Sequence, residues 1–120
     1  MASAIKKNFD SPDESRSMEG GKVDVVTLGE VTGMRITANP GWKWSNNVKP
    51  IAQTDSCQVN HIGYQISGRL RVKLDDGTET EYGPGDAYNI PPGHDAWVVG
   101  DEPMVGVDFR GGATYAKPKS

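Results

Sequence analysis

The chain has one cysteine and two histidines, and all three lie beside sequences that are typical of β-turns. Cys57 and His61 bracket the segment Cys-Gln-Val-Asn-His, and His94 directly follows Pro-Pro-Gly. Thiolate and imidazole are ligands that zinc, copper and iron accept, whereas carboxylates alone suit harder ions. If the fold brings the three side chains together, they form a metal site with three protein ligands and one open position. That is the arrangement of a catalytic rather than a structural zinc site.

The spacing of Cys57 and His61 leaves the metal interpretation open. In a continuous strand, residues four apart are separated by roughly 13 Å, which is too far for one ion. Val59 and Tyr64 favour strand here, so a shared site requires a bend, and Asn60 is a tolerable turn residue. The alternative is that the cysteine is a small buried hydrophobe and that each histidine satisfies a local hydrogen bond.

The elements that must position these residues are predicted to be short strands. Fifteen glycines and eight prolines indicate many turns, and no segment predicts a convincing helix. The clearest strand covers residues 69–74, where apolar and basic residues alternate before the turn Asp75-Asp76-Gly77-Thr78 and a returning strand. Further strands are expected near residues 22–28, 32–38, 42–44, 57–66, 87–90, 96–99 and 104–109. Roughly eight to ten strands at turn spacings of about eight to twelve residues indicate an all-β sandwich or barrel.

Length and composition limit the classes of function. The 120 residues suffice for one domain, which we divide into a polar N-terminal arm (1–21), a β domain (22–110) and a C-terminal tail (111–120). A formal net charge of −3 provides no basic surface, so nucleic acid is not an expected partner. We expect no signal peptide and no membrane span. A lone cysteine cannot form an internal disulfide, and the expected location is therefore the reducing cytoplasm.

Two motifs resemble those of the cupin superfamily. The segment Gly85-Asp86-Ala87-Tyr88-Asn89-Ile90-Pro91-Pro92-Gly93 is similar to the opening of the second cupin motif. The segment from His61 to Leu70 looks like the end of the first motif, with Gly68 as its closing glycine. The resemblance covers roughly residues 38–109. It implies a double-stranded β-helix (jelly-roll) barrel with an extended N-terminal arm, and a homodimer as the expected assembly.

The resemblance also implies an altered ligand set. Counting back from Gly68, His61 stands where the family has an acidic or amide ligand, Cys57 stands on the second histidine and Asp55 on the first. The histidine of the second motif corresponds to Ala96, which cannot bind a metal. His94 lies two residues earlier and would share the face of Ala96 in an extended strand. The implied ligands are Cys57, His61 and His94, with Asp55 as a weak fourth, and a histidine-rich iron dioxygenase site is not present.

The leading hypothesis is a small metal-binding cupin that holds a small polar molecule in its barrel, with zinc favoured and iron or copper as alternatives. An enzyme would use the ion as a Lewis acid or oxygen-activating centre. The alternatives are a ligand-binding or sensory module without turnover, and a metal-free structural domain.

Four aromatic residues are candidates for the wall of a ligand pocket: Trp42, Trp44, Tyr64 and Trp97. The other interpretation of the tryptophans is that they anchor the core or a dimer interface. Asp95 follows His94 directly, and its carboxylate either orients the imidazole or opens the turn.

Overall fold

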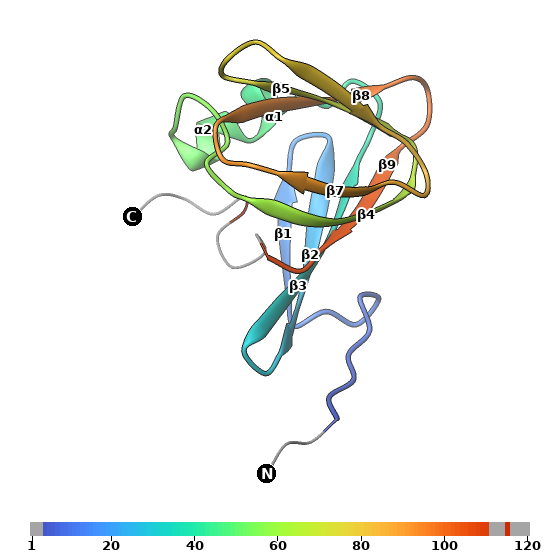
Figure 1. The fold of residues 1–120 in the computed structure, drawn as a ribbon. Coiled ribbons are helices and arrows are strands. Elements are labelled where there is room, and N and C mark those ends of the chain that lie inside the picture. The colour runs from blue at the N-terminus through green and yellow to red at the C-terminus, as the bar shows by residue number, and fades with distance from the viewer. Residues whose placement is uncertain (1–3, 111–114, 116–120) are drawn as a thin grey trace.

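A computed structural model describes residues 4–110 and residue 115, and its elements in this part of the chain are nine strands and two single-turn helices (Figure 1). The strands are β1 (Glu14–Met18), β2 (Gly21–Leu28), β3 (Val31–Ala38), β4 (His61–Ser67), β5 (Arg69–Leu74), β6 (Glu79–Tyr82), β7 (Ala87–Ile90), β8 (His94–Val99) and β9 (Met104–Asp108). The helices are α1 (Trp44–Asn47) and α2 (Lys49–Ala52). The predicted tail, residues 111–120, lies outside the described residues except for Tyr115.

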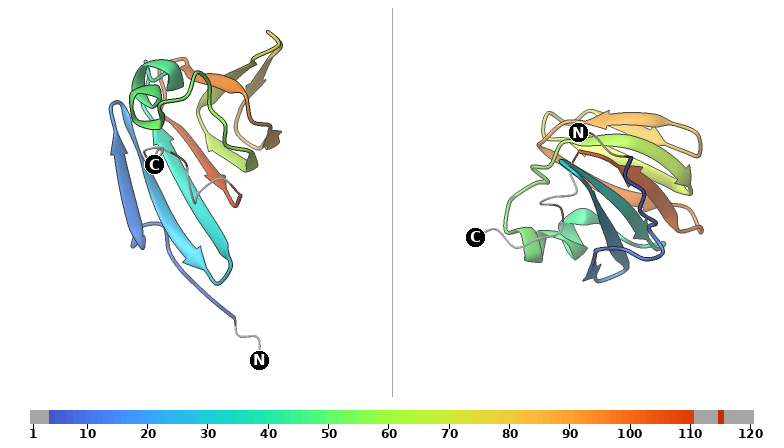
Figure 2. Two further views of the ribbon diagram at one scale, coloured as in Figure 1. Left: turned by 90° about the vertical axis from the view of Figure 1, so that its left-hand side faces the viewer. Right: turned by 90° about the horizontal axis from the view of Figure 1, so that it is seen from below.

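The strands form two antiparallel sheets. One has six strands in the order β1-β2-β3-β9-β4-β7, and the other has three in the order β6-β5-β8. Strands that are distant in sequence are neighbours, as in the pairs β3–β9, β4–β7 and β5–β8. The long β2–β3 hairpin extends beyond the shorter strands on one side of the molecule (Figure 2). The predicted all-β jelly-roll architecture is confirmed.

The segment predicted to be a polar arm contains a strand. β1 pairs with β2 in register from Glu14↔Val25 to Met18↔Gly21, and so extends the six-stranded sheet. Before this strand, the chain lies against Arg35 of β3, whose guanidinium contacts the Phe9 carbonyl oxygen (3.2 Å) and the Asp10 carboxylate (2.9 Å). These residues of the arm are therefore attached to the domain.

The hairpin predicted after residue 74 is present. Leu70 pairs with Tyr82 and Lys73 with Glu79, and Gly77 takes the turn with φ +93°. Its amide donates to the Leu74 carbonyl oxygen at 2.9 Å, which closes the turn.

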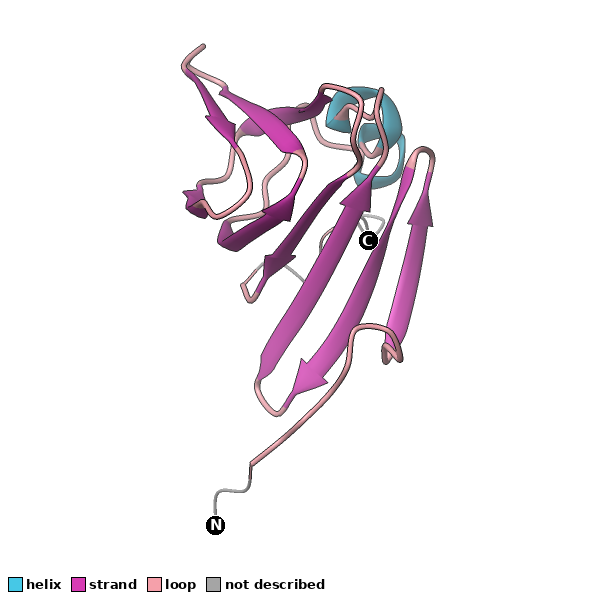
Figure 3. Cartoon of the chain, turned by 90° about the vertical axis from the view of Figure 1, so that its right-hand side faces the viewer, coloured by secondary structure: helices cyan, strands magenta, loops and turns pink. Residues whose placement is uncertain are grey.

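The expectation of no helix was wrong at two places. α1 and α2 follow one another at one end of the sheets (Figure 3). Each has only four residues, too few for a helical period to register in the sequence. The strand expected at 42–44 is reduced to one bridge between Lys43 and Trp97. None of the helices in the described part of the chain has the length and apolarity needed to cross a bilayer.

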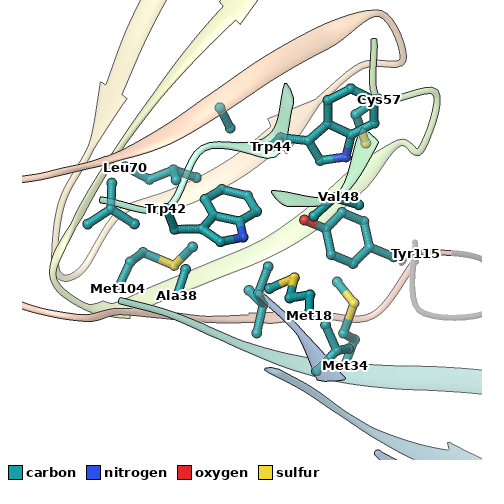
Figure 4. Packing of buried hydrophobic residues seen from close by; sticks show 14 of the residues in the cluster. Met18, Met34, Ala38, Trp42, Trp44, Val48, Cys57, Leu70, Met104 and Tyr115 are labelled. Atoms are coloured by element: carbon teal, nitrogen blue, oxygen red, sulfur yellow. The ribbon is translucent and has the colours of Figure 1, made fainter. Parts of the chain in front are cut away.

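The core lies between the two sheets, and strands such as β5 and β8 contribute alternate residues to it. In β5, Leu70 and Val72 are buried, and in β8, Ala96 and Val98 are buried opposite them. This alternation follows from the period of two that a strand imposes on its side chains. Figure 4 shows how part of this core packs around two tryptophans and four sulfur-containing residues. Those labelled are Met18, Met34, Ala38, Trp42, Trp44, Val48, Cys57, Leu70, Met104 and Tyr115.

Candidate metal centre

The three predicted ligand residues lie together inside the domain. One ligand atom from each of Cys57, His61 and His94 falls within 4.8 Å of the others, and all three residues are buried. His61 opens β4 and His94 opens β8, so the two histidines come from different sheets. Their rings meet edge to face, with centroids 5.4 Å apart.

A break in the strand pattern allows Cys57 and His61 to approach each other. Cys57 forms an isolated antiparallel bridge with His94, with its amide donating to the His94 carbonyl oxygen at 2.7 Å. Residues 58–60 belong to no strand, and Asn60 donates its side-chain amide to the Ile90 carbonyl oxygen at 2.8 Å. The predicted bend is confirmed, and it leaves Cys57 Sγ 3.8 Å from His61 Nε2.

The turn before β8 sets the position of His94. Gly93 has φ +88°, in the left-handed region that a residue with a Cβ rarely adopts, and its amide donates to the Cys57 carbonyl oxygen at 2.7 Å. A Cβ on Gly93 would lie 2.8 Å from a carboxylate oxygen of Asp75. The Pro-Pro-Gly sequence thus fixes the backbone that joins the cysteine and the second histidine.

A buried carboxylate orients His61. Its Nδ1 lies 2.5 Å from Oδ2 of Asp108, a residue of β9 with no exposed surface. A carboxylate accepts hydrogen bonds, so Nδ1 carries a proton and Nε2 is the nitrogen that can offer a lone pair to an ion. That lone pair is on the side of the ring facing the Cys57 sulfur.

A backbone carbonyl orients the imidazole ring of His94. Its Nδ1 donates to the Pro91 oxygen at 2.7 Å, which leaves Nε2 free to bind. Asp95 does not orient this ring, because its Oδ1 accepts from the amides of Ser45 (3.0 Å) and Ala96 (2.9 Å). The prediction that His94 shares the face of Ala96 is confirmed, since both are buried members of β8.

Burial keeps Cys57 and His94 uncharged in the absence of an ion. Desolvation, with smaller contributions from the carboxylates of Asp108 and Asp95, raises the pKa of the Cys57 thiol to about 12. Desolvation, followed by the neighbouring His61, lowers the pKa of His94 to about 4. At neutral pH the group is therefore a thiol beside a neutral His94 imidazole, and an ion would displace the thiol proton.

The donor set fits a transition metal. In a tetrahedral zinc site, bond lengths of about 2.3 Å to sulfur and 2.0 Å to nitrogen place a sulfur and a nitrogen ligand roughly 3.5 Å apart. The observed separation of Cys57 Sγ and His61 Nε2, 3.8 Å, is close to this value. Both histidines are already held in the tautomer that offers Nε2, so small side-chain movements would complete the site.

A cavity of about 40 Å³ adjoins the two histidines. Its lining is mostly apolar, and includes Met34, Ile36, Trp42, Trp44, His61, Gln65, Leu70, Val72, Tyr88, Ile90, His94, Ala96, Met104 and Tyr115. Two of the four predicted pocket aromatics, Trp42 and Trp44, belong to this wall and are at most 3% exposed.

The other two pocket aromatics are elsewhere. Tyr64 is 47% exposed, because alternation in β4 turns it away from the face of His61 and Gln65. Trp97 lies under the Lys43 ammonium, 5.3 Å from its ring centroid, and is not part of the cavity wall. Asp55, the weak fourth ligand, is exposed and is not part of the cluster of Cys57 and the histidines.

Two residues near the site were missed at the level of sequence. Asp108 had a detectable signal, because it shares the inward face of β9 with Met104 and Gly106, where an acidic residue is unusual. Tyr115 had none, since only the fold brings it to His61, with ring centroids 5.1 Å apart. Its carbonyl oxygen accepts a hydrogen bond from Arg16 of β1 at 2.6 Å.

No protein-family model matches the chain, and no curated protein does either. Solved structures do match. An oxalate decarboxylase from Lactobacillus farciminis, in its formate complex, has a TM-score of 0.60 at 18% identity over 85% of this chain. A substitution variant of Bacillus subtilis oxalate decarboxylase has a TM-score of 0.65 at 20% identity over 94% of this chain.

The chain spans about a third of these decarboxylases, 32% and 31% of their lengths. A match of similar size is KdgF from Halomonas sp., with a TM-score of 0.54 at 18% identity over 78% of this chain and 80% of that protein. At these identities the likeness is one of fold.

Proposed function

We propose that this chain, which has the fold of the cupin superfamily, is a metal-binding protein that holds a small polar molecule beside its ion. The observation that carries the proposal is the convergence of one buried thiol and two buried imidazoles, each imidazole with Nδ1 bonded to an acceptor. A bound metal would stabilise this buried arrangement further, because the free energy of metal binding adds to that of folding.

Cys57, His61 and His94 would hold the ion, and zinc is the first candidate because it accepts mixed sulfur and nitrogen ligands and keeps a fourth position open. Iron and copper accept the same ligand types. When bound, such an ion supplies a Lewis acid that polarises an oxygen ligand. Asp108 orients His61 and the Pro91 carbonyl orients His94, while the apolar cavity excludes bulk water.

Elemental analysis of the purified chain tests the metal site. We expect one transition-metal ion per chain, and its loss in both Cys57→Ser and His61→Ala. Asp55→Ala is the matched control, because Asp55 is a nearby exposed acidic residue outside the cluster. Stoichiometric metal in both ligand variants, or none in the wild type, would contradict the proposal and favour a metal-free structural domain.

A binding or sensory protein without turnover is the second candidate. It is favoured by the cavity wall, which within the described residues contains no carboxylate and no Lys or Arg to act as a general acid or base. Oxygen consumption and hydrolysis by the metal-loaded protein, measured against panels of small molecules, separate the two candidates. Tight binding without turnover supports the sensory role.

A row of exposed apolar residues on β4 supports a homodimer. Ile62, Tyr64 and Ile66 share its outer face and are 41–48% exposed, and Val107 of β9 pairs beside Tyr64. An apolar stripe without charges suits the self-complementary contact of two identical copies. Light scattering tests this assembly: we expect a dimer for wild type and a monomer for Tyr64→Glu.

We propose that the protein is located in the cytoplasm, where its only cysteine stays reduced.

A further inference from the structure

The cavity contains a hydrogen-bond donor without a partner. Trp42 is 3% exposed, and its indole Nε1 has no hydrogen-bond acceptor among the residues that the structure describes. Within that part of the chain it is the one buried side-chain nitrogen or oxygen in this condition. Leaving such a group unpaired is unfavourable, because it has lost its bond to water and gained nothing in return.

The unpaired donor and the candidate metal centre belong to the same cavity. Trp42, His61 and His94 all contribute to its wall, and so does Tyr115. Figure 4 shows the Trp42 indole nitrogen and the Tyr115 hydroxyl pointing toward the space between the two rings. A molecule bound at the open position of an ion would therefore extend into a space that presents an N–H group.

The chemistry and size of the cavity define what it can hold. Indole N–H only donates, so the group that meets it must be an acceptor. The other walls are largely apolar, and the volume of about 40 Å³ compares with the roughly 10–15 Å³ that a cavity needs to hold one water molecule. The occupant therefore has only a few non-hydrogen atoms.

We infer that the cavity is a binding site for a small carboxylate, of the size of formate or acetate, which is held between the ion and the Trp42 N–H. One carboxylate oxygen binds the ion and the other accepts the hydrogen bond from Trp42 Nε1. A carboxylate offers two acceptor oxygens and no donor, and its charge is matched by the ion rather than left in an apolar space. This inference rests on the proposed metal site and adds the class of ligand.

Proton–nitrogen correlation spectra of the zinc-loaded protein test the inference directly. The chain has three tryptophans and hence three indole N–H signals, and the one absent in Trp42→Phe belongs to Trp42. Titration with sodium formate, and separately with acetate, is expected to move the Trp42 signal downfield in a saturable manner. The Trp97 signal is expected to stay in place, since that side chain is outside the cavity.

The same titrations give affinities for the variants. Trp42→Phe is expected to bind formate roughly 10- to 100-fold more weakly than wild type, because a hydrogen bond to a charged group is lost. Trp97→Phe is expected to bind it as wild type does, and benzoate is expected to be excluded by size. The wild-type spectra remain decisive if Trp42→Phe does not fold.

Zinc content, measured first, separates this inference from the proposed function. If wild type holds zinc but formate and acetate leave the Trp42 signal unmoved, the ligand inference is overturned and the metal site stands. Equal affinity for formate in wild type and folded Trp42→Phe overturns it as well. If wild type holds no transition metal, both proposals fail together.

Discussion

Replacing Asp108 with asparagine tests the orientation of His61, because it exchanges one carboxylate oxygen for an NH₂ group and barely changes the size of the side chain. In the native site, Asp108 Oδ2 accepts from His61 Nδ1, while Oδ1 accepts from the Arg110 amide at 2.8 Å. An asparagine keeps one oxygen, which the Arg110 amide retains. Its NH₂ group then faces His61 Nδ1, and two donors meet. The imidazole responds by moving its proton to Nε2, the atom that an ion requires.

Two effects of this substitution oppose each other. Loss of a charge-assisted hydrogen bond costs roughly 1.5–3 kcal/mol, in agreement with the 10- to 100-fold loss of metal affinity that such supporting residues typically cause. Removing the carboxylate also relieves part of the upward shift in the pKa of Cys57, which favours the thiolate. Desolvation is the largest cause of that shift and the charge of Asp108 is a smaller one, so the loss prevails. We expect zinc to bind Asp108→Asn about 10- to 100-fold more weakly.

Competition between the apo-protein and a chromogenic zinc chelator measures this affinity. Asp101→Asn serves as the control, since it makes the same change of charge at an exposed position. Thermal unfolding establishes that both variants are folded. Zinc affinity in Asp108→Asn equal to or above that of wild type would refute the assigned role of Asp108.

Three further predictions concern pH and backbone geometry. Because the pKa of Cys57 is raised to about 12, zinc binding should release one proton from the thiol between pH 7 and 9, and zinc affinity should rise about tenfold per pH unit. Titration calorimetry in buffers of different ionisation enthalpy measures the number of protons released. Release of no proton would contradict this prediction. Because the pKa of His94 is lowered to about 4 from 6.5, the apo-protein should lose stability as pH falls from 6.5 to 4, by roughly 3 kcal/mol. The free energy of unfolding measured in urea should change less with pH over that range in His94→Gln than in wild type. Gly93→Ala should lower the free energy of unfolding by roughly 1–3 kcal/mol in the same assay and weaken zinc binding, because the φ of +88° and the nearby Asp75 oxygen oppose a Cβ at this position. An unchanged unfolding midpoint would contradict the role of this turn in positioning His94.

Local patterns predicted much of the β architecture because strand periodicity and turn chemistry act over few residues. The alternation in 69–74 and the glycine turn at 75–78 correspond directly to β5, its turn and β6. The same rules did not predict α1 and α2, which are too short to show a period and depend on packing, as the 2% exposure of Trp44 indicates. The strand in the N-terminal arm was missed because its residues are mainly polar and its pairing partner, β2, supplies the ladder.

The four predicted pocket aromatics also show what residue type can and cannot predict. Trp42, Trp44, Tyr64 and Trp97 are alike as residue types, and type alone predicted a pocket wall. Only Trp42 and Trp44 reach the cavity. Tyr64 and Trp97 lie on the faces of β4 and β8 opposite the buried residues, and which face of a strand is buried depends on its pairing with other strands.

The sequence alone determined that one cysteine and two histidines are present as soft ligands, that turns lie beside them, and that a shared site needs a bend between Cys57 and His61. Tertiary structure decided that the three side chains meet, because β4 and β8 belong to different sheets and only the packing of those sheets brings their first residues together. It also decided the partners of the ligands, Asp108 and the Pro91 carbonyl, and the neighbour Tyr115 from far along the chain. Hydrogen bonds and metal sites act over a few ångströms in space, and separation along the chain does not limit them.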